Sequence, residues 1–82
     1  MWYVILCMQP YPNGAGVNVY HPHDRNAARD LALSILNGTH KHGAAPCLHI
    51  QLWNDEGNMV RARCCRSEYD VQAWMNDACA YF

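Results

Sequence analysis

The sequence predicts a single α+β domain with the element order ββαββα, in which a four-stranded, mainly antiparallel sheet carries two helices on one face. Three observations lead to this prediction. Two pairs of strand-like segments are each joined by a short turn, and each pair is followed by a segment with apolar residues at helical spacing. The 82 residues suffice for one packed core but not for two. We therefore expect one domain over residues 1–82.

The first strand pair is expected near the N-terminal end of the sequence. Residues 2–9 form an almost unbroken apolar run, typical of a strand near the centre of a sheet. The turn signal Pro12-Asn13-Gly14 follows, and residues 17–20 then alternate between apolar and polar. Together these features predict a β-hairpin.

The two helices are predicted from capping residues and apolar stripes. Asp24 can cap a helix that runs to Asn37-Gly38 and has apolar positions at Ala27, Ala28, Leu31, Ala32, Ile35 and Leu36. Ser67, with Asp70 three positions later, resembles a capping box. The second helix then has an apolar stripe at Val71, Trp74, Met75, Ala78 and Phe82.

The second hairpin has a register that can be derived. Leu48, Ile50 and Leu52 alternate with polar residues, which indicates one buried face. A three-residue loop, Asp55-Glu56-Gly57, with Gly57 in the left-handed conformation, pairs these three residues with Cys64, Ala62 and Val60, respectively. On the opposite face, the expected partners of Cys47, His49, Gln51 and Trp53 are Cys65, Arg63, Arg61 and Met59.

This predicted outward face supplies the candidate binding residues His49, Gln51, Trp53, Met59, Arg61 and Arg63. Two arginines beside an aromatic ring and a histidine are typical of a surface that binds an acidic partner, or that stacks and pairs with nucleotides. Arginine and glutamine on an exposed strand also serve solubility alone. Both interpretations stay open from the sequence.

The five cysteines suggest reduced thiols in a cytoplasmic protein, because their number is odd and no secretion signal is recognisable. The predicted register brings Cys47, His49 and Cys65 together, which gives three zinc-compatible donors without a fourth. We expect no metal and no cofactor. A zinc-dependent or cysteine-dependent small enzyme or sensor is the third-ranked hypothesis.

Composition and motifs exclude several classes of function. The net charge of −1 disfavours strong non-specific binding to nucleic acid. No apolar run approaches the roughly 20 residues that a membrane span requires. No catalytic motif and no phosphate-binding glycine loop appears, so we do not expect an enzyme.

A resemblance adds to this interpretation. The strand at residues 2–8, the strand at 17–20, the helix start Asp24-Arg25-Asn26-Ala27-Ala28 and the hairpin at 48–64 resemble small phage-encoded ββαββ proteins, some of which are anti-CRISPR inhibitors. The resemblance implies a compact, non-enzymatic binder that occludes a surface on a host nucleoprotein complex. Such proteins often use acidic patches that mimic nucleic acid, whereas this chain is nearly neutral. Blocking by shape is then the implied mode of action.

The leading hypothesis is thus a non-catalytic accessory or inhibitor module that binds another protein or a nucleoprotein complex by steric occlusion. The alternative is a small nucleic-acid-binding domain that uses the same open sheet face. Homodimerisation through an edge strand or through that face also stays open.

Overall fold

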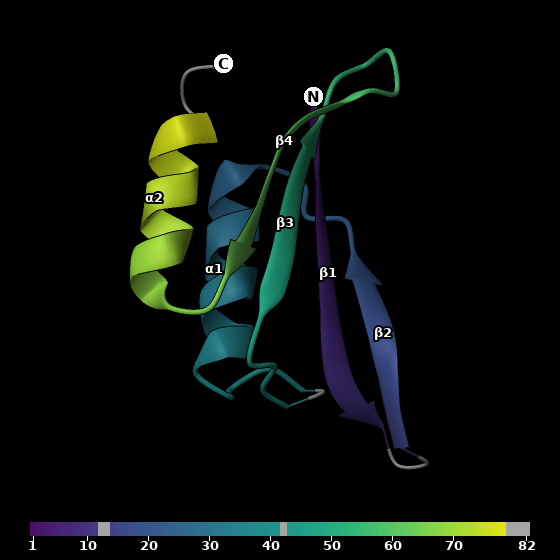
Figure 1. The fold of residues 1–82 in the computed structure, drawn as a ribbon, viewed down its shortest axis with the longest axis vertical. Helices are drawn as coiled ribbons and strands as arrows, with labels where there is room; N and C mark the ends of the chain where they lie inside the picture. Colours follow the sequence, from purple (N-terminus) through teal and green to yellow (C-terminus); the bar gives the residue numbers. More distant parts are fainter. Residues whose placement is uncertain (12–13, 42, 79–82) are drawn as a thin grey trace.

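The computed structural model describes residues 1–11, 14–41 and 43–78 and contains the predicted elements in the predicted order (Figure 1). The strands are β1 (Trp2–Tyr11), β2 (Gly14–Tyr20), β3 (Leu48–Trp53) and β4 (Met59–Cys65), and the helices are α1 (Arg25–Leu36) and α2 (Glu68–Ala78). The sheet order is β2-β1-β3-β4, and all three strand pairs are antiparallel. The predicted α+β fold and the order ββαββα are confirmed.

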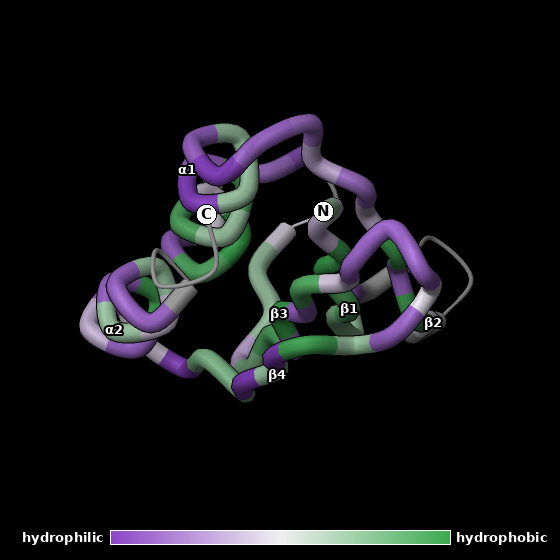
Figure 2. The backbone as a smooth tube through the Cα atoms, turned by 90° about the horizontal axis from the view of Figure 1, so that it is seen from above, coloured by the Kyte–Doolittle hydropathy of each residue, from purple (hydrophilic) through white to green (hydrophobic). Residues whose placement is uncertain are grey.

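Both helices pack on the same side of the sheet (Figure 1). Alternate residues of the central strands meet them in the core, namely Tyr3, Ile5 and Cys7 of β1 and Leu48, Ile50 and Leu52 of β3. The helices contribute Ile35 of α1 and Val71 and Trp74 of α2, among others. Figure 2 shows the middle of the sheet in the colour of hydrophobic residues. One face of the sheet therefore builds the core, and the other carries no helix.

The helices begin at the predicted caps. The Asp24 carboxylate accepts a hydrogen bond from the Ala27 N–H at 2.8 Å, which satisfies one of the unpaired donors at the start of α1. The Ser67 hydroxyl accepts one from the Asp70 N–H at 3.2 Å at the start of α2. The predicted α2 stripe is buried at Val71, Trp74 and Met75, while Phe82 lies outside the described residues.

The first hairpin pairs β1 with β2 from Ile5 opposite Tyr20 to Tyr11 opposite Gly14. This pairing confirms the predicted hairpin, although Pro12 and Asn13 of its turn lie outside the described residues. On its other edge β1 pairs with β3. The first strand is therefore central in the sheet, as its apolar run predicts.

A buried glutamine ties this hairpin to the loop that follows α1. Gln9 is 1% exposed, and its Oε1 accepts hydrogen bonds from Asn18 Nδ2 at 2.9 Å, Tyr20 OH at 2.7 Å and Cys7 Sγ at 3.1 Å. Its Nε2 donates to the Gly43 carbonyl at 2.6 Å. Gln9 thereby uses both ends of its amide, as a polar side chain in a core must.

The β3–β4 loop has the predicted geometry. Gly57 has a φ of 81°, and its N–H donates to the Asn54 carbonyl at 3.2 Å, which closes the turn. Directly after this loop, Trp53 lies opposite Met59, as expected. The predicted register of the second hairpin is therefore confirmed for its first pair, Trp53 and Met59.

Beyond that pair the predicted register is wrong by one residue. The ladder shifts between Leu52 and Trp53, so that Val60 is an extra residue on β4. Such a bulge is common on edge strands. The actual partners of Leu48, Ile50 and Leu52 are Cys65, Arg63 and Arg61, not Cys64, Ala62 and Val60. Because side chains alternate along a strand, this shift exchanges the two faces of β4 from Arg61 onwards.

Candidate functional site

The side chains that point away from the helices form a surface that we call the uncovered face. Strand alternation and the observed register assign to it Trp2, Val4, Leu6, Met8, Val17, Val19, His49, Gln51, Trp53, Met59, Ala62 and Cys64. None of these described residues carries a formal charge at neutral pH when His49 is neutral. The uncovered face is thus a largely apolar sheet surface, whose described residues include no Asp, Glu, Lys or Arg.

Several large apolar side chains on this face are open to solvent. The exposed fractions run from 40% to 58% for Trp2, Met8, Val17, Val19 and Met59. A single exposed apolar residue needs no explanation, but five of them on one sheet face of a small domain indicate a contact surface.

An aromatic pair closes one end of the uncovered face. Trp2 and Trp53 lie opposite each other on β1 and β3, and their rings stack with centroids 5.3 Å apart and planes 17° apart. The His21 ring lies 6.3 Å from the Trp2 ring. The Trp2 indole N–H donates to the Asn54 carbonyl at 3.2 Å, which fixes the ring in place.

A row of hydrogen bonds continues from this pair along β3. The Trp53 indole N–H donates to Gln51 Oε1 at 2.9 Å, so the Gln51 amide nitrogen is left to donate to His49 Nδ1 at 3.1 Å. An indole nitrogen is only a donor, which fixes the orientation of the amide and makes His49 Nδ1 the unprotonated nitrogen. Three predicted site residues, His49, Gln51 and Trp53, are therefore joined on one face.

The two predicted arginines do not belong to this group. Arg61 and Arg63 point to the helix side, where Arg61 donates to the Asp77 carboxylate at 2.8 Å and Arg63 lies 3.5 Å from the Asp70 carboxylate. Their expected place beside His49, Gln51 and Trp53 is wrong, because the bulge turns them to the other face. Met59 keeps its expected place opposite Trp53.

The bulge also separates the three expected zinc donors. Cys65 is buried opposite Leu48 on the helix side, whereas Cys64 is exposed opposite His49. The expected trio of Cys47, His49 and Cys65 is therefore not assembled. Within the described part of the chain, no group of three or more His, Cys, Asp or Glu residues is placed to hold a metal ion.

The environment raises the pKa values of three thiols, those of Cys7, Cys64 and Cys65. A hydrogen bond from the Cys64 thiol to the Cys47 sulfur is the main cause of the raised pKa of Cys64. Burial raises the pKa of Cys65 to about 11, and burial also raises that of Cys7. A nucleophilic cysteine needs the opposite shift. These three thiols are thus not activated for catalysis.

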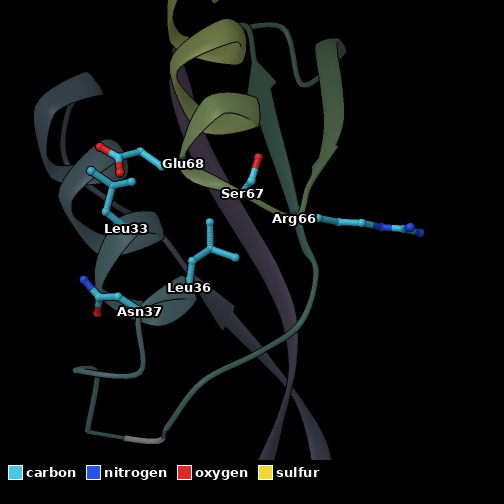
Figure 3. A pocket seen from close by; sticks show the side chains of 6 residues that line it. All are labelled: Leu33, Leu36, Asn37, Arg66, Ser67 and Glu68. Carbon is cyan, nitrogen blue, oxygen red and sulfur yellow. The ribbon is translucent and has the colours of Figure 1, made fainter.

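A hollow of about 300 Å³ lies away from the uncovered face, where the end of α1 meets the start of α2 (Figure 3). Leu33 and Leu36 line it from α1, Glu68 from α2 and Ser67 from the residue before α2, while the Arg66 side chain extends away from it. The Ser67 hydroxyl already accepts the capping hydrogen bond of α2. The hollow is a notch between two packed helices with no set of reactive groups.

Sequence reasoning missed the contribution of β1 and β2 to the uncovered face. The signal was present, because Val17 and Val19 alternate with Asn18 and Tyr20. Recognising Met8 and Trp2 as exposed required the knowledge that both helices leave this side of the central strand bare.

Comparison with protein-family models, with curated proteins and with solved structures finds no match to this chain. Neither α1 nor α2 has the length and apolar character of a helix that crosses a membrane, and the described residues include no other helix.

Proposed function

We propose that this protein is a non-catalytic protein-binding module of the accessory or inhibitor type, and that it docks on its partner through the uncovered face. One observation carries the proposal. Trp2, Met8, Val17, Val19 and Met59 are exposed together on a sheet face that has no formally charged described residue. Tryptophan and methionine are enriched in protein interfaces, whose centres are depleted in charge.

The dimensions of the face suit a small interface. Four strands spaced about 4.8 Å apart and about seven residues long give a footprint of roughly 19 by 24 Å, on the order of 450 Å² in projection. The accessible area of such a corrugated surface is larger, which brings it near the roughly 800 Å² per partner of standard interfaces. The fixed Trp2–Trp53 pair provides a rigid anchor, which costs little conformational entropy on binding.

A specific form of this proposal follows from the resemblance to small phage proteins. In that form the module acts in the cytoplasm as an anti-CRISPR-type inhibitor, and it occupies a surface of a host defence complex. The neutral, apolar character of the uncovered face supports blocking by shape rather than by imitation of a nucleic acid.

Nucleic-acid binding is the weaker candidate. The Trp2–Trp53 pair offers stacking surface for bases. However, backbone phosphates are bound mainly by arginine and lysine, and Arg61 and Arg63 lie on the helix side next to Asp77 and Asp70. A zinc-dependent or cysteine-dependent activity has less support, because the pKa values of Cys64 and Cys65 are raised and the expected donor trio is split.

The proposal is tested by affinity capture from bacterial lysate, with and without nuclease, compared between matched variants. Met8→Glu places a charge on the uncovered face, whereas Tyr69→Glu changes a large side chain of α2 that is 79% exposed. We expect the wild type and Tyr69→Glu to retain the same stoichiometric protein partner and Met8→Glu to lose it. Equal capture by all three proteins, or recovery of nucleic acid alone without nuclease, would overturn the proposal.

A further inference from the structure

Strand β2 is an edge strand whose free backbone groups can be assigned. Pro10 lies opposite Ala15 and has no N–H, so this pair is not one that exchanges two backbone hydrogen bonds. Because the two kinds of pair alternate, Met8–Val17 and Leu6–Val19 are also of the kind without hydrogen bonds. The backbone N–H and C=O groups of Val17 and Val19 therefore point away from β1, toward the open edge.

The two edges of the sheet differ in how they are protected against pairing with another strand. On β4, Val60 forms a bulge, and Arg61 and Arg63 direct charges onto the inner face. Both features hinder the addition of a further strand. On β2, the segment Gly14–Tyr20 contains no proline and no charged residue. Among the described strands, β2 is thus the one whose edge is open and unprotected.

We propose that β2 of one molecule pairs in antiparallel orientation with β2 of a second copy, so that the two sheets join into one of eight strands. The register with the greatest overlap places Val17 opposite Val17 of the other copy and Gly14 opposite Tyr20. In this register the outward backbone N–H and C=O groups of Val17 in the two copies face each other. The outward backbone groups of Val19 in one copy face those of Ala15 in the other. An antiparallel pair of identical strands has two-fold symmetry, which is the usual symmetry of a dimer.

This pairing extends the uncovered face without occupying it. The two-fold axis stands perpendicular to the sheet, so the helices of both copies lie on one side and both uncovered faces lie on the other. Val17 and Val19, which are 58% and 52% exposed, gain neighbours from the other copy on that side. No charged side chain of β2 is brought against its own copy. The inference goes beyond the proposed function, because it concerns the edge and needs no foreign partner.

The size of the contact predicts a weak dimer. Seven paired residues span about 24 Å, and a sheet edge about 10 Å thick gives on the order of 250 Å² in projection for each copy. This area is below that of stable interfaces, so we expect a dissociation constant between about 10 µM and about 1 mM. The dimer is therefore concentration-dependent.

Sedimentation equilibrium between about 10 µM and about 2 mM protein tests this inference. For the wild type we expect the mass to rise from 9.4 kDa toward twice that value. Val17→Pro removes an outward N–H while leaving the hydrogen bonds to β1, so it is expected to stay at 9.4 kDa with an unchanged circular dichroism spectrum. Ala62→Pro is the matched control, because the same alternation points the Ala62 N–H outward from β4, and it should dimerise like the wild type.

A wild type that stays at the mass of one chain up to about 2 mM would overturn the inference, as would a Val17→Pro protein that dimerises normally. Should Val17→Pro fail to fold, Val17→Lys takes its place, since it keeps the backbone and sets two ammonium groups against each other at the axis. Its dissociation constant should rise at least about tenfold at low salt. Met8→Glu separates the two proposals, because it is expected to lose the foreign partner and keep the dimer.

Discussion

The Arg61 guanidinium donates to the Asp77 carboxylate across 2.8 Å, from strand β4 to helix α2. About two turns earlier on α2, Asp70 lies 3.5 Å from Arg63. Two arginines that alternate along β4 thus face two carboxylates on the helix packed beside it. This complementarity accounts for the side of the sheet on which β4 places its charges.

The Arg61–Asp77 pair is expected to contribute little stability. The side chains are 44% and 49% exposed, so water screens their attraction, and Arg61→Ala should lower the free energy of unfolding by at most about 1 kcal/mol. Urea unfolding of both single variants and of the double variant with Asp77→Ala measures the coupling, which we expect at about 0.2–1 kcal/mol. Strictly additive effects would show that the pair does not form in solution.

Gln9 is expected to contribute much more to the stability of the fold than the Arg61–Asp77 pair does. In Gln9→Leu, the donors of Asn18 and Tyr20 lose their shared acceptor and the Gly43 carbonyl loses its donor. The variant loses the hydrogen bonds that a fully buried amide makes to β2 and to the loop after α1, so the free energy of unfolding should fall by about 2–3 kcal/mol. Gln72→Leu on the exposed side of α2 is the matched control and should change it by about 0.5 kcal/mol or less. Similar changes in the free energy of unfolding at both positions would contradict the view that the hydrogen bonds of the buried Gln9 amide stabilise the fold.

Stability should depend on the protonation of Asp70. The hydrogen bond from the Arg66 N–H, at 2.9 Å, and the nearby Arg63 cation hold the pKa of Asp70 below its ordinary value of 3.8. A carboxyl whose pKa is lowered by folding stabilises the protein above its unfolded pKa, and this contribution disappears as the pH falls through the folded pKa.

Asp70→Asn removes this titration while keeping a side-chain oxygen for the Arg66 N–H. We expect its free energy of unfolding to fall less steeply than that of the wild type as the pH drops below about 4. Urea unfolding at pH values from about 6 to about 2 makes the comparison. Parallel curves for the two proteins would mean that folding leaves the pKa of Asp70 unchanged.

The sequence alone was sufficient to predict an element of the fold wherever a local residue pattern had only one structural interpretation. Asp24 before an apolar stripe placed the start of α1, and Gly57 after Asp55-Glu56 placed the turn of the second hairpin. In both cases a specific backbone requirement, an unpaired N–H or a positive φ, selects the residue type.

The faces of β4 could not be predicted, because its alternation has two interpretations. Val60, Ala62 and Cys64 are more apolar than Arg61 and Arg63, which favours placing the first set inside. However, Ala62 and Cys64 are small and lose little by exposure, while arginine stems can pack along a helix with their charged ends in water. The decisive partners, Asp70 and Asp77, lie on a separate element, so the choice depends on tertiary structure. Two of the six candidate residues, Arg61 and Arg63, were misplaced for this reason.

Alkylation should reveal the contact between two thiols. The Cys47 sulfur accepts a hydrogen bond from Cys64 and so raises the pKa of the Cys64 thiol. In Cys47→Ala the pKa of Cys64 should therefore fall, and Cys64 should react faster with iodoacetamide at about pH 8. Mass spectrometry of the peptides identifies the labelled site. Cys65, which is fully buried, serves as the internal control and should stay unlabelled until urea is added. An unchanged Cys64 rate would show that the two sulfurs are not in contact.

Deleting single residues of β4 tests the bulge directly. Val60 has no partner on β3, so its deletion should leave the pairs Leu52–Arg61 and Ile50–Arg63 intact and keep the coupling between Arg61 and Asp77. Deleting Ala62 instead also removes the extra residue, but it turns Arg61 to the uncovered face, and the coupling should vanish. Double-mutant cycles with Asp77→Ala measure the coupling in both backgrounds.

The two deletions also separate the observed register from the one without a bulge. In a hairpin without a bulge, Val60 would lie opposite Leu52 on the helix side, and its deletion would turn every later residue of β4 to the opposite face. Arg61 would then arrive opposite Leu52 on the helix side, where Asp77 lies, and the coupling would be gained rather than kept. The bulged register alone therefore predicts the following pattern. Arg61 and Asp77 are coupled in the wild type, the coupling remains when Val60 is deleted, and it is lost when Ala62 is deleted.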